Sequence, residues 1–161
     1  MTSGRPDRRT FRRDADGDDL EPERPRQGAR SAARQRALGL LYQADLLEQP
    51  IATVLARELN DPLRERPDPY MVELVGGVDR RRVELDERIG AAAERWSLDR
   101  MPLVDRNLLR LATFELLSST DVPTAVILDE AVELAKLLST EDSGRFVNGV
   151  LGRIAREVRP A

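Results

Sequence analysis

DVPTAVILDEAVELAKLLSTEDSGRFVNGVLGRI, residues 121–154, is the stretch that decides the fold. It predicts two amphipathic helices joined by a short polar turn, because apolar residues recur every three or four positions on both sides of that turn. We expect Thr124 to cap the first helix, and Asp142 or Ser143 to cap the second. The stretch holds no usual catalytic constellation, so it favours a surface that binds over a pocket that reacts.

Helical periodicity extends from this stretch back to about Ser31, and no segment alternates in the way of a half-buried strand. Asp68 followed by Pro69 is typical of a helix start. Gly76 and Gly77 would either kink the long helix that begins there or allow close packing. The expected helices are 31–49, 51–59, 69–96, 102–118, 124–138 and 142–159. The pattern predicts an all-α bundle of six or seven helices.

Composition excludes most catalytic chemistry. Cysteine and histidine are both absent, so thiolate sites, the commonest metal ligand and the commonest general base are missing. We expect no catalytic residue, no bound metal and no cofactor. The net charge of −3 argues against charge-driven binding of nucleic acid, so any such site must be local. No apolar run is long enough to span a membrane and no secretory signal is present, so we expect a cytoplasmic protein.

The first 29 residues differ in composition from the rest. They contain seven acidic and seven basic side chains and almost no large apolar ones. Such a segment buries too little surface to offset its ordering entropy. We therefore expect a disordered charged tail over 1–29 and a folded domain over 30–161.

The last helix divides into two faces. Its apolar stripe comprises Val147, Val150, Leu151, Ile154 and Val158. Arginines at 145, 153 and 156 fall on another face, with glycine at 149 between them and Phe146 at the border. Arginines beside a rim aromatic suit single-stranded nucleic acid, since phosphates meet guanidinium groups and a base stacks on the ring. The alternative is that Phe146 packs inward and the arginines are merely solvated.

Two further features leave alternatives open. Leu38, Tyr42 and Leu46 form a second stripe on the first helix, which is either buried in the bundle or exposed for a partner. Glu115 lies within an apolar stripe, and we expect it to pair with an arginine inside the bundle because a buried carboxylate requires a partner.

Several ordered motifs resemble the NusB family of bacterial transcription antitermination factors. The resemblance covers roughly Arg30 to Pro160. The motifs that carry it are ALGLLYQ (37–43), VDRNLLRLATFELL (104–117), DVP (121–123), DEAVELAK (129–136) and EDSGRFVNGVL (141–151).

The resemblance implies two small helical subdomains and binding of the boxA element of ribosomal RNA leader transcripts. It implies NusE, a small-subunit ribosomal protein, as partner within an antitermination complex on RNA polymerase; some relatives form homodimers. Asp105 matches a position near the NusE interface. One departure is that residues 31–33 separate the first two arginines of a cluster that is denser in many members. The implied RNA-binding residues are Arg30, Arg34, Tyr42, Asp142, Arg145 and Phe146.

These observations favour a non-catalytic RNA-binding protein. Two rivals stand beside this hypothesis. A NusB-like domain also precedes the catalytic domain of some ribosomal RNA cytosine methyltransferases, although this chain shows no cofactor-binding half. A protein-only adaptor would use the Leu38, Tyr42 and Leu46 stripe to bind a partner helix.

Overall fold

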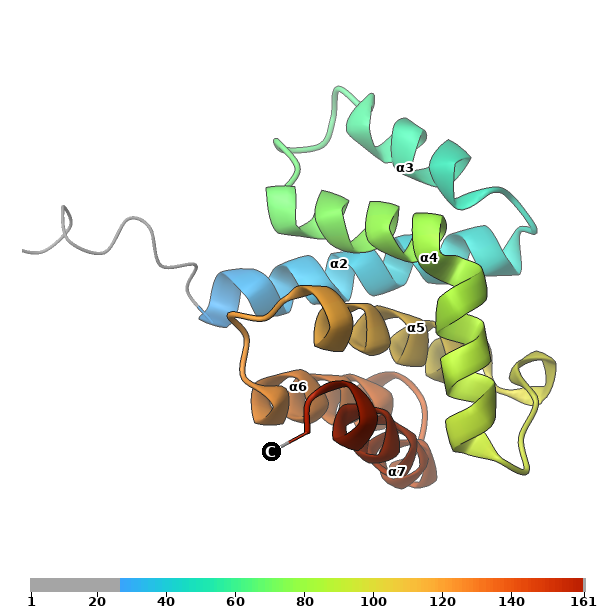
Figure 1. Ribbon diagram of the computed structural model, residues 1–161. Helices are drawn as coiled ribbons and strands as arrows, with labels where there is room; N and C mark the ends of the chain where they lie inside the picture. The colour runs from blue at the N-terminus through green and yellow to red at the C-terminus, as the bar shows by residue number, and fades with distance from the viewer. Residues whose placement is uncertain (1–26, 161) are drawn as a thin grey trace, which may run out of the picture.

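The computed structural model describes residues 27–160 and shows an all-helical fold (Figure 1). No strand occurs among these residues, as the periodicity predicts. Residues 1–26 of the predicted tail lie outside the described part, whereas 27–29 already belong to the first helix. The elements are α2 (Gln27–Leu46), α3 (Ile51–Leu59), α4 (Pro69–Ala93), η1 (Leu98–Arg100, a 3-10 helix), α5 (Leu103–Ser118), α6 (Thr124–Leu138) and α7 (Glu141–Val158).

The described residues form six α-helices, so the prediction of a seventh is wrong for this part of the chain. Helix α4 itself consists of two helical segments that meet at a kink, where Arg81 has non-helical backbone angles (φ −109°, ψ 17°). Of the two roles predicted for Gly76 and Gly77, a kink or close packing, the structure shows close packing. A Cβ at Gly77 would lie only 2.0 Å from Cζ of Phe114. Gly77 therefore lets α4 and α5 approach closely.

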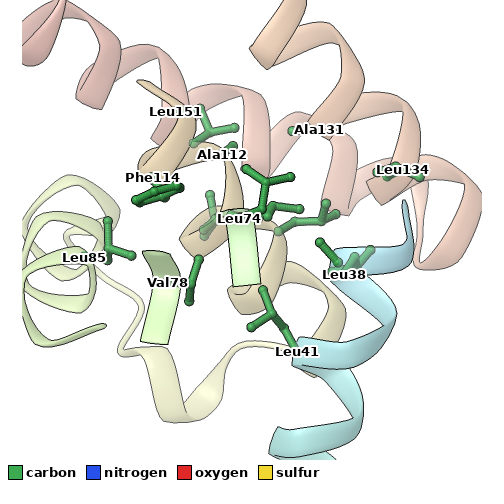
Figure 2. Packing of buried hydrophobic residues seen from close by; sticks show 14 of the residues in the cluster. Leu38, Leu41, Leu74, Val78, Leu85, Ala112, Phe114, Ala131, Leu134 and Leu151 are labelled. Atoms are coloured by element: carbon green, nitrogen blue, oxygen red, sulfur yellow. The ribbon is translucent and has the colours of Figure 1, made fainter. Parts of the chain in front are cut away.

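Helix α5 forms the centre of the molecule. It packs against α2, α4, α6 and α7, and it lies between the α2–α4 layer and the α6–α7 layer in Figure 1. Most of its residues are buried, including the charged Asp105, Arg110 and Glu115, so the helix has almost no solvent face. Figure 2 shows Phe114 of α5 beside Val78 and Leu85 of α4, with Leu151 of α7 on the other side. The core is therefore continuous between the two layers.

The helix starts agree only in part with the sequence expectations. Asp68 caps α4 as predicted, since its Oδ1 accepts a hydrogen bond of 2.7 Å from the backbone N–H of Tyr70. The expected caps of the last two helices are wrong. Thr124 is already the first residue of α6, and no side chain caps that helix. Thr140 caps α7, because its extended backbone lets Oγ1 accept from the N–H of Ser143 at 2.9 Å.

Arg159 fastens the end of α7 to the end of α5. Its guanidinium group donates to the carbonyl oxygens of Leu116 (2.9 Å), Ser119 (2.7 Å) and Val122 (2.6 Å). These carbonyls lie in the last turn of α5 and in the loop that follows, where helical partners are lacking. These hydrogen bonds fix how α7 lies across the bundle.

Within residues 27–160, no helix combines the length and the apolar character that crossing a membrane requires.

Candidate nucleic-acid interface

The predicted division of α7 into a core face and an arginine face is confirmed. Val147, Val150, Leu151 and Ile154 are buried. Arginines 145, 153 and 156 are exposed, as is glycine 149 between them. A Cβ at this glycine would meet no atom within 4 Å, so the face is open to a large ligand at its middle.

The arginines of this face differ in how firmly they are held. Arg145 forms an ion pair with Asp142, and the two side chains are 72% and 87% exposed. Such an exposed pair contributes at most about 1 kcal/mol, so a phosphate can replace the carboxylate. Arg153 is fixed more firmly, because its Nη1 donates a 2.7 Å hydrogen bond to the carbonyl oxygen of Ala92 at the end of α4. The arginine face is thereby joined to α4.

Phe146 lies at the border of the two faces, as predicted, and it is half-buried. Its ring meets that of Trp96 edge to face, with 6.4 Å between ring centroids and 74° between planes. Trp96 is 53% exposed. Together the rings of Trp96 and Phe146 form a solvent-accessible pair, the aromatic corner.

Sequence reasoning missed Trp96 because it placed this residue on the core stripe of the long helix. The helix ends at Ala93, and Glu94 takes a positive φ of 52°. The chain therefore turns, and Trp96 leaves the stripe. No glycine or proline stands between Ala93 and Trp96, so the sequence carries no ordinary signal for this turn.

A pocket of about 260 Å³ opens beside the aromatic corner, where the chain following α4 meets the starts of α5 and α7. Met101 and Pro102 add apolar walls to it. Asp105 also lines it, and this side chain is only 3% exposed. Oδ2 of Asp105 accepts a 2.9 Å hydrogen bond from the Ser143 hydroxyl. Its Oδ1 is buried and accepts no hydrogen bond from the described residues.

The resemblance places Asp105 near a partner interface, and that role stays a prediction. Its carboxylate lies inside the molecule rather than on an outer face, because it binds the first turn of α7 through Ser143. A ligand reaches it only by entering the pocket. Asp142 lines the same pocket at its exposed side.

Arg34 is also placed differently from the prediction. It is only 2% exposed, and its Nε donates to both oxygens of Glu115, at 2.8 and 3.0 Å. Glu115 is thus paired with an arginine inside the bundle, as expected. Arg34 therefore does not lie on the surface: one turn before buried Leu38, it points into the core. Its role in RNA binding stays a prediction.

Arg30 and Tyr70 extend this buried network. Arg30 donates to Oδ2 of Asp121 at 3.0 Å, and its guanidinium carbon lies 4.5 Å from the centre of the Tyr70 ring. The hydroxyl of Tyr70 donates to Glu115 at 2.6 Å. Burial, together with this hydrogen bond, raises the pKa of Tyr70 to about 12. Burial alone would lower the pKa of Arg34, but its bonds to Glu115 raise that pKa overall.

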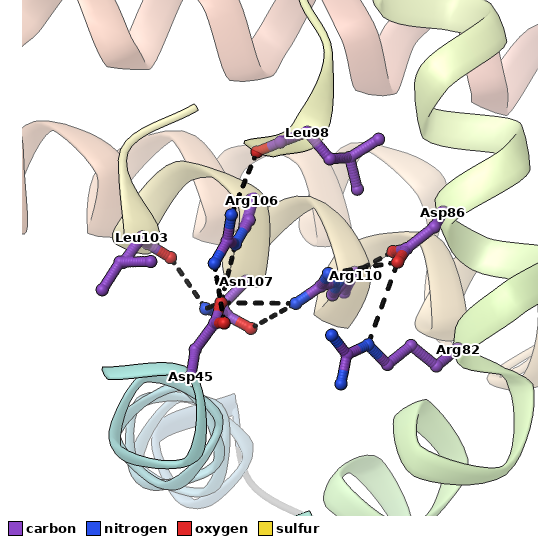
Figure 3. Close-up of polar contacts among 8 residues, drawn as sticks. All are labelled: Asp45, Arg82, Asp86, Leu98, Leu103, Arg106, Asn107 and Arg110. Carbon is purple, nitrogen blue, oxygen red and sulfur yellow. Dashed lines mark hydrogen bonds and ion pairs between the residues drawn. The ribbon is translucent and has the colours of Figure 1, made fainter. Parts of the chain in front are cut away.

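A second polar network joins Asp45 of α2 to Arg106 and Asn107 of α5 (Figure 3). Asp45 accepts two 2.7 Å hydrogen bonds from Arg106 and one of 2.9 Å from Asn107. Burial raises the pKa of Asp45, but the bonds from Arg106 and Asn107 lower it more, so the net shift is downward. Arg106 also donates to the carbonyl oxygen of Leu98 at 3.2 Å. This bond positions η1, and thereby the segment that walls the pocket.

The predicted site residues form two groups. Asp142, Arg145 and Phe146 lie together in the first turns of α7. Arg30 lies at the start of α2, which packs against α3, α4 and α5. Tyr42 is half-buried further along α2, between a buried Leu38 and an exposed Leu46. The strip expected for a protein-only adaptor is therefore not a continuous exposed surface.

Comparisons with known proteins agree with this architecture. The model of the NusB family matches residues 31–156. The transcription antitermination protein NusB of Saccharopolyspora erythraea is 54% identical over 129 residues, which cover 80% of this chain and 87% of that protein. The corresponding protein of Salinispora arenicola is 50% identical over 129 residues, or 79% and 95% of the two chains.

Solved structures give the same result. T. maritima NusB superimposes with a TM-score of 0.70 at 38% identity, covering 80% of this chain and 91% of that one. A chain in a crystal structure of the antitermination factors NusB and NusE in complex with double-stranded RNA gives a TM-score of 0.69 at 30% identity, covering 80% and 96%.

Proposed function

The chain belongs to the NusB family, and from that premise we propose that it is a transcription antitermination factor that binds boxA RNA of ribosomal RNA leader transcripts together with NusE. Its relatives carry the name of antitermination proteins, and one similar structure contains NusB, NusE and RNA. The function is binding rather than catalysis. The single observation that supports an RNA site on this chain is the exposed arginine face of α7 beside the aromatic corner.

In this proposal the first turns of α7 make the principal RNA contact. Arg145 exchanges its exposed partner Asp142 for a phosphate, which costs little because the ion pair is solvated. Phe146 stacks on a base. Arg30, whose side chain is 17% exposed, and Tyr42 are secondary candidates on α2. Arg34 acts indirectly, by holding α2 against α5 through Glu115.

The remaining parts of the proposal concern assembly. NusE completes the RNA site on this chain, and the pair joins an antitermination complex on RNA polymerase in the cytoplasm. Homodimers would cover the RNA face when RNA is absent. We also propose that the family's two subdomains correspond here to α2, α3 and the first half of α4, and to the remaining helices. The overall acidic charge supports dependence on a partner, since it opposes binding by charge alone.

The proposal is tested by titrating boxA RNA against the protein with and without purified NusE, while the mass of the species formed is measured in parallel. We expect the complex with NusE to bind more tightly than the chain alone. Phe146→Ala should weaken RNA binding by about 1–3 kcal/mol for one lost stack. Leu137→Ala is the matched control, because Leu137 is an exposed apolar residue on α6. Unchanged boxA affinity of the Phe146→Ala complex would remove this ring from the site.

The salt dependence of binding tests the arginine face separately. Arg145→Ala should reduce the slope of affinity against salt by about one counterion. Arg64→Ala removes an exposed arginine from the loop before α4 and serves as the charge-matched control. Failure of boxA RNA to bind, with and without NusE, would refute the proposed function itself.

A further inference from the structure

We infer that Lys136 of α6 binds a phosphate of the RNA, and that the RNA strand crosses the start of α7 instead of following this helix along its length. The inference rests on the proposed RNA-binding function and adds to it one residue and the direction of the strand. Lys136 is the only lysine among the 26 lysines and arginines of the chain. It lies in the last turn of α6, and its side chain is exposed.

The stem of Lys136 lies across the first turn of α7. Helices α6 and α7 pack side by side (Figure 1). A Cβ added at Gly144 would be 2.8 Å from Cγ of Lys136 and 3.2 Å from Cε, so the methylene groups occupy the space that a side chain at Gly144 would need. Because Cε carries the ammonium group, this contact holds the charge of Lys136 beside α7. A side chain that is already ordered loses less freedom when it binds a ligand.

The ammonium group of Lys136 has no carboxylate partner among the described residues. Glu133 precedes it by three positions on α6, a spacing at which glutamate and lysine commonly pair, but the two form no ion pair. In the first turn of α7, Asp142 pairs with Arg145, and Glu141 does not pair with Lys136. A cation that is held in place without a carboxylate can accept an anion from outside the chain without first losing a partner.

Lys136 lies on the side of Arg145 that is opposite the aromatic corner. Successive residues of a helix are rotated by about 100°, so Phe146, Arg145 and Gly144 follow one another around α7. A strand that stacks a base on Phe146 and places a phosphate at Arg145 reaches Lys136 next if it crosses the helix. A strand that followed α7 would instead pass Arg156, about three turns further on.

The single lysine allows a direct test by acetylation. We would treat the complex of the full chain with NusE with sulfosuccinimidyl acetate and quantify acetylated Lys136 by mass spectrometry. BoxA RNA should slow the acetylation of Lys136, whereas RNA of the same length and a scrambled sequence should not. Protection of Lys136 by NusE alone, with no further protection by boxA RNA, would assign this residue to the protein partner and overturn the inference.

Substitution of Lys136 tests the same contact through affinity. Lys136→Gln should reduce the slope of log affinity against log salt by about 0.7, the value for one phosphate of a single strand, which corresponds to about fivefold weaker boxA binding at 0.1 M salt. Lys136→Arg keeps the charge and should retain most of the affinity. Gly144→Ala displaces the stem at an unchanged net charge and should also weaken binding. Arg80→Gln is the control, because it removes an exposed arginine from α4.

The outcomes separate this inference from the proposed function. An unchanged slope in Lys136→Gln, or equal acetylation with and without boxA RNA while the RNA still binds, would overturn the inference and leave the function intact. A slope that is lowered by Arg156→Gln but not by Lys136→Gln would place the strand along α7 and overturn the inference as well. Failure of boxA RNA to bind the unaltered complex would refute the proposed function, and this inference with it.

Discussion

The contact between Gly77 and Phe114 gives the sharpest test of the packing. A Cβ added at Gly77 would lie 2.0, 2.3 and 2.6 Å from Cζ, Cε1 and Cε2 of the ring, whereas ordinary contacts begin at 3.4 Å. The ring or the helix must therefore retreat by more than about 1 Å within a close-packed interior. Overpacking costs about 1–3 kcal/mol, and a clash with a buried ring lies at the upper end. Alanine has a helix propensity about 1 kcal/mol more favourable than glycine, which offsets part of this cost. The free energy of unfolding of Gly77→Ala should therefore be lower by about 2 kcal/mol.

The neighbouring glycine provides a matched control. A Cβ at Gly76 would meet only Nη1 of Arg80, at 3.1 Å, and this flexible end can move. Gly76→Ala should therefore stabilise the protein by about 0.5–1 kcal/mol. Urea unfolding followed by helical circular dichroism measures both. Equal stability of the two variants would refute the reasoning. Restored stability in Gly77→Ala combined with Phe114→Leu would assign the loss to this contact.

Three further predictions concern the helix ends and the buried network. Arg159→Ala should cost about 1.5–3 kcal/mol in urea unfolding, because buried carbonyls lose a charged donor, whereas Arg156→Ala on the exposed face should cost little. Thr140→Ala should cost about 1 kcal/mol through the lost cap of α7, measured in the same way. The pKa of Tyr70 is raised to about 12 by burial and by its bond to Glu115. Its contribution to stability should be complete below the ordinary value of 10.0 and fall as the pH rises towards 12, and Tyr70→Phe should remove that dependence in unfolding measured against pH.

The fold could be predicted from sequence wherever apolar spacing decides it. Helix α3 has the predicted bounds, 51–59, and the core stripes of α6 and α7 are buried almost as expected. Leu138 is an exception, since it is the last residue of α6 and is 45% exposed. Helix ends were predicted less well, because capping depends on where the chain turns. Thr140 and Asp142 are both good capping residues, and only the backbone geometry selects Thr140.

The site could be predicted only in part. Phe146 and Arg145 follow from a helical wheel, because both lie on one helix. Trp96 and Asp105 do not, since the pocket that they share is assembled from the chain after α4 and the first turn of α5. Arg34 shows the converse error. Arg34 lies one turn before Leu38, and this spacing indicates that its side chain faces the core. Its neighbours in the sequence include other arginines, and that composition wrongly suggests an exposed side chain.

The partners of the arginines explain why we propose the RNA site on α7 rather than on α2. Arg34 and Arg110 are held by carboxylates, and both side chains are at most 5% exposed. Releasing Arg34 to a phosphate would break its ion pair with the buried Glu115, and breaking a buried ion pair costs about 3–5 kcal/mol. Arg145 loses only a solvated partner, at a cost below about 1 kcal/mol. In a chain of net charge −3, the burial of the acidic partners therefore decides which arginines can bind phosphate, rather than the density of arginine along the sequence.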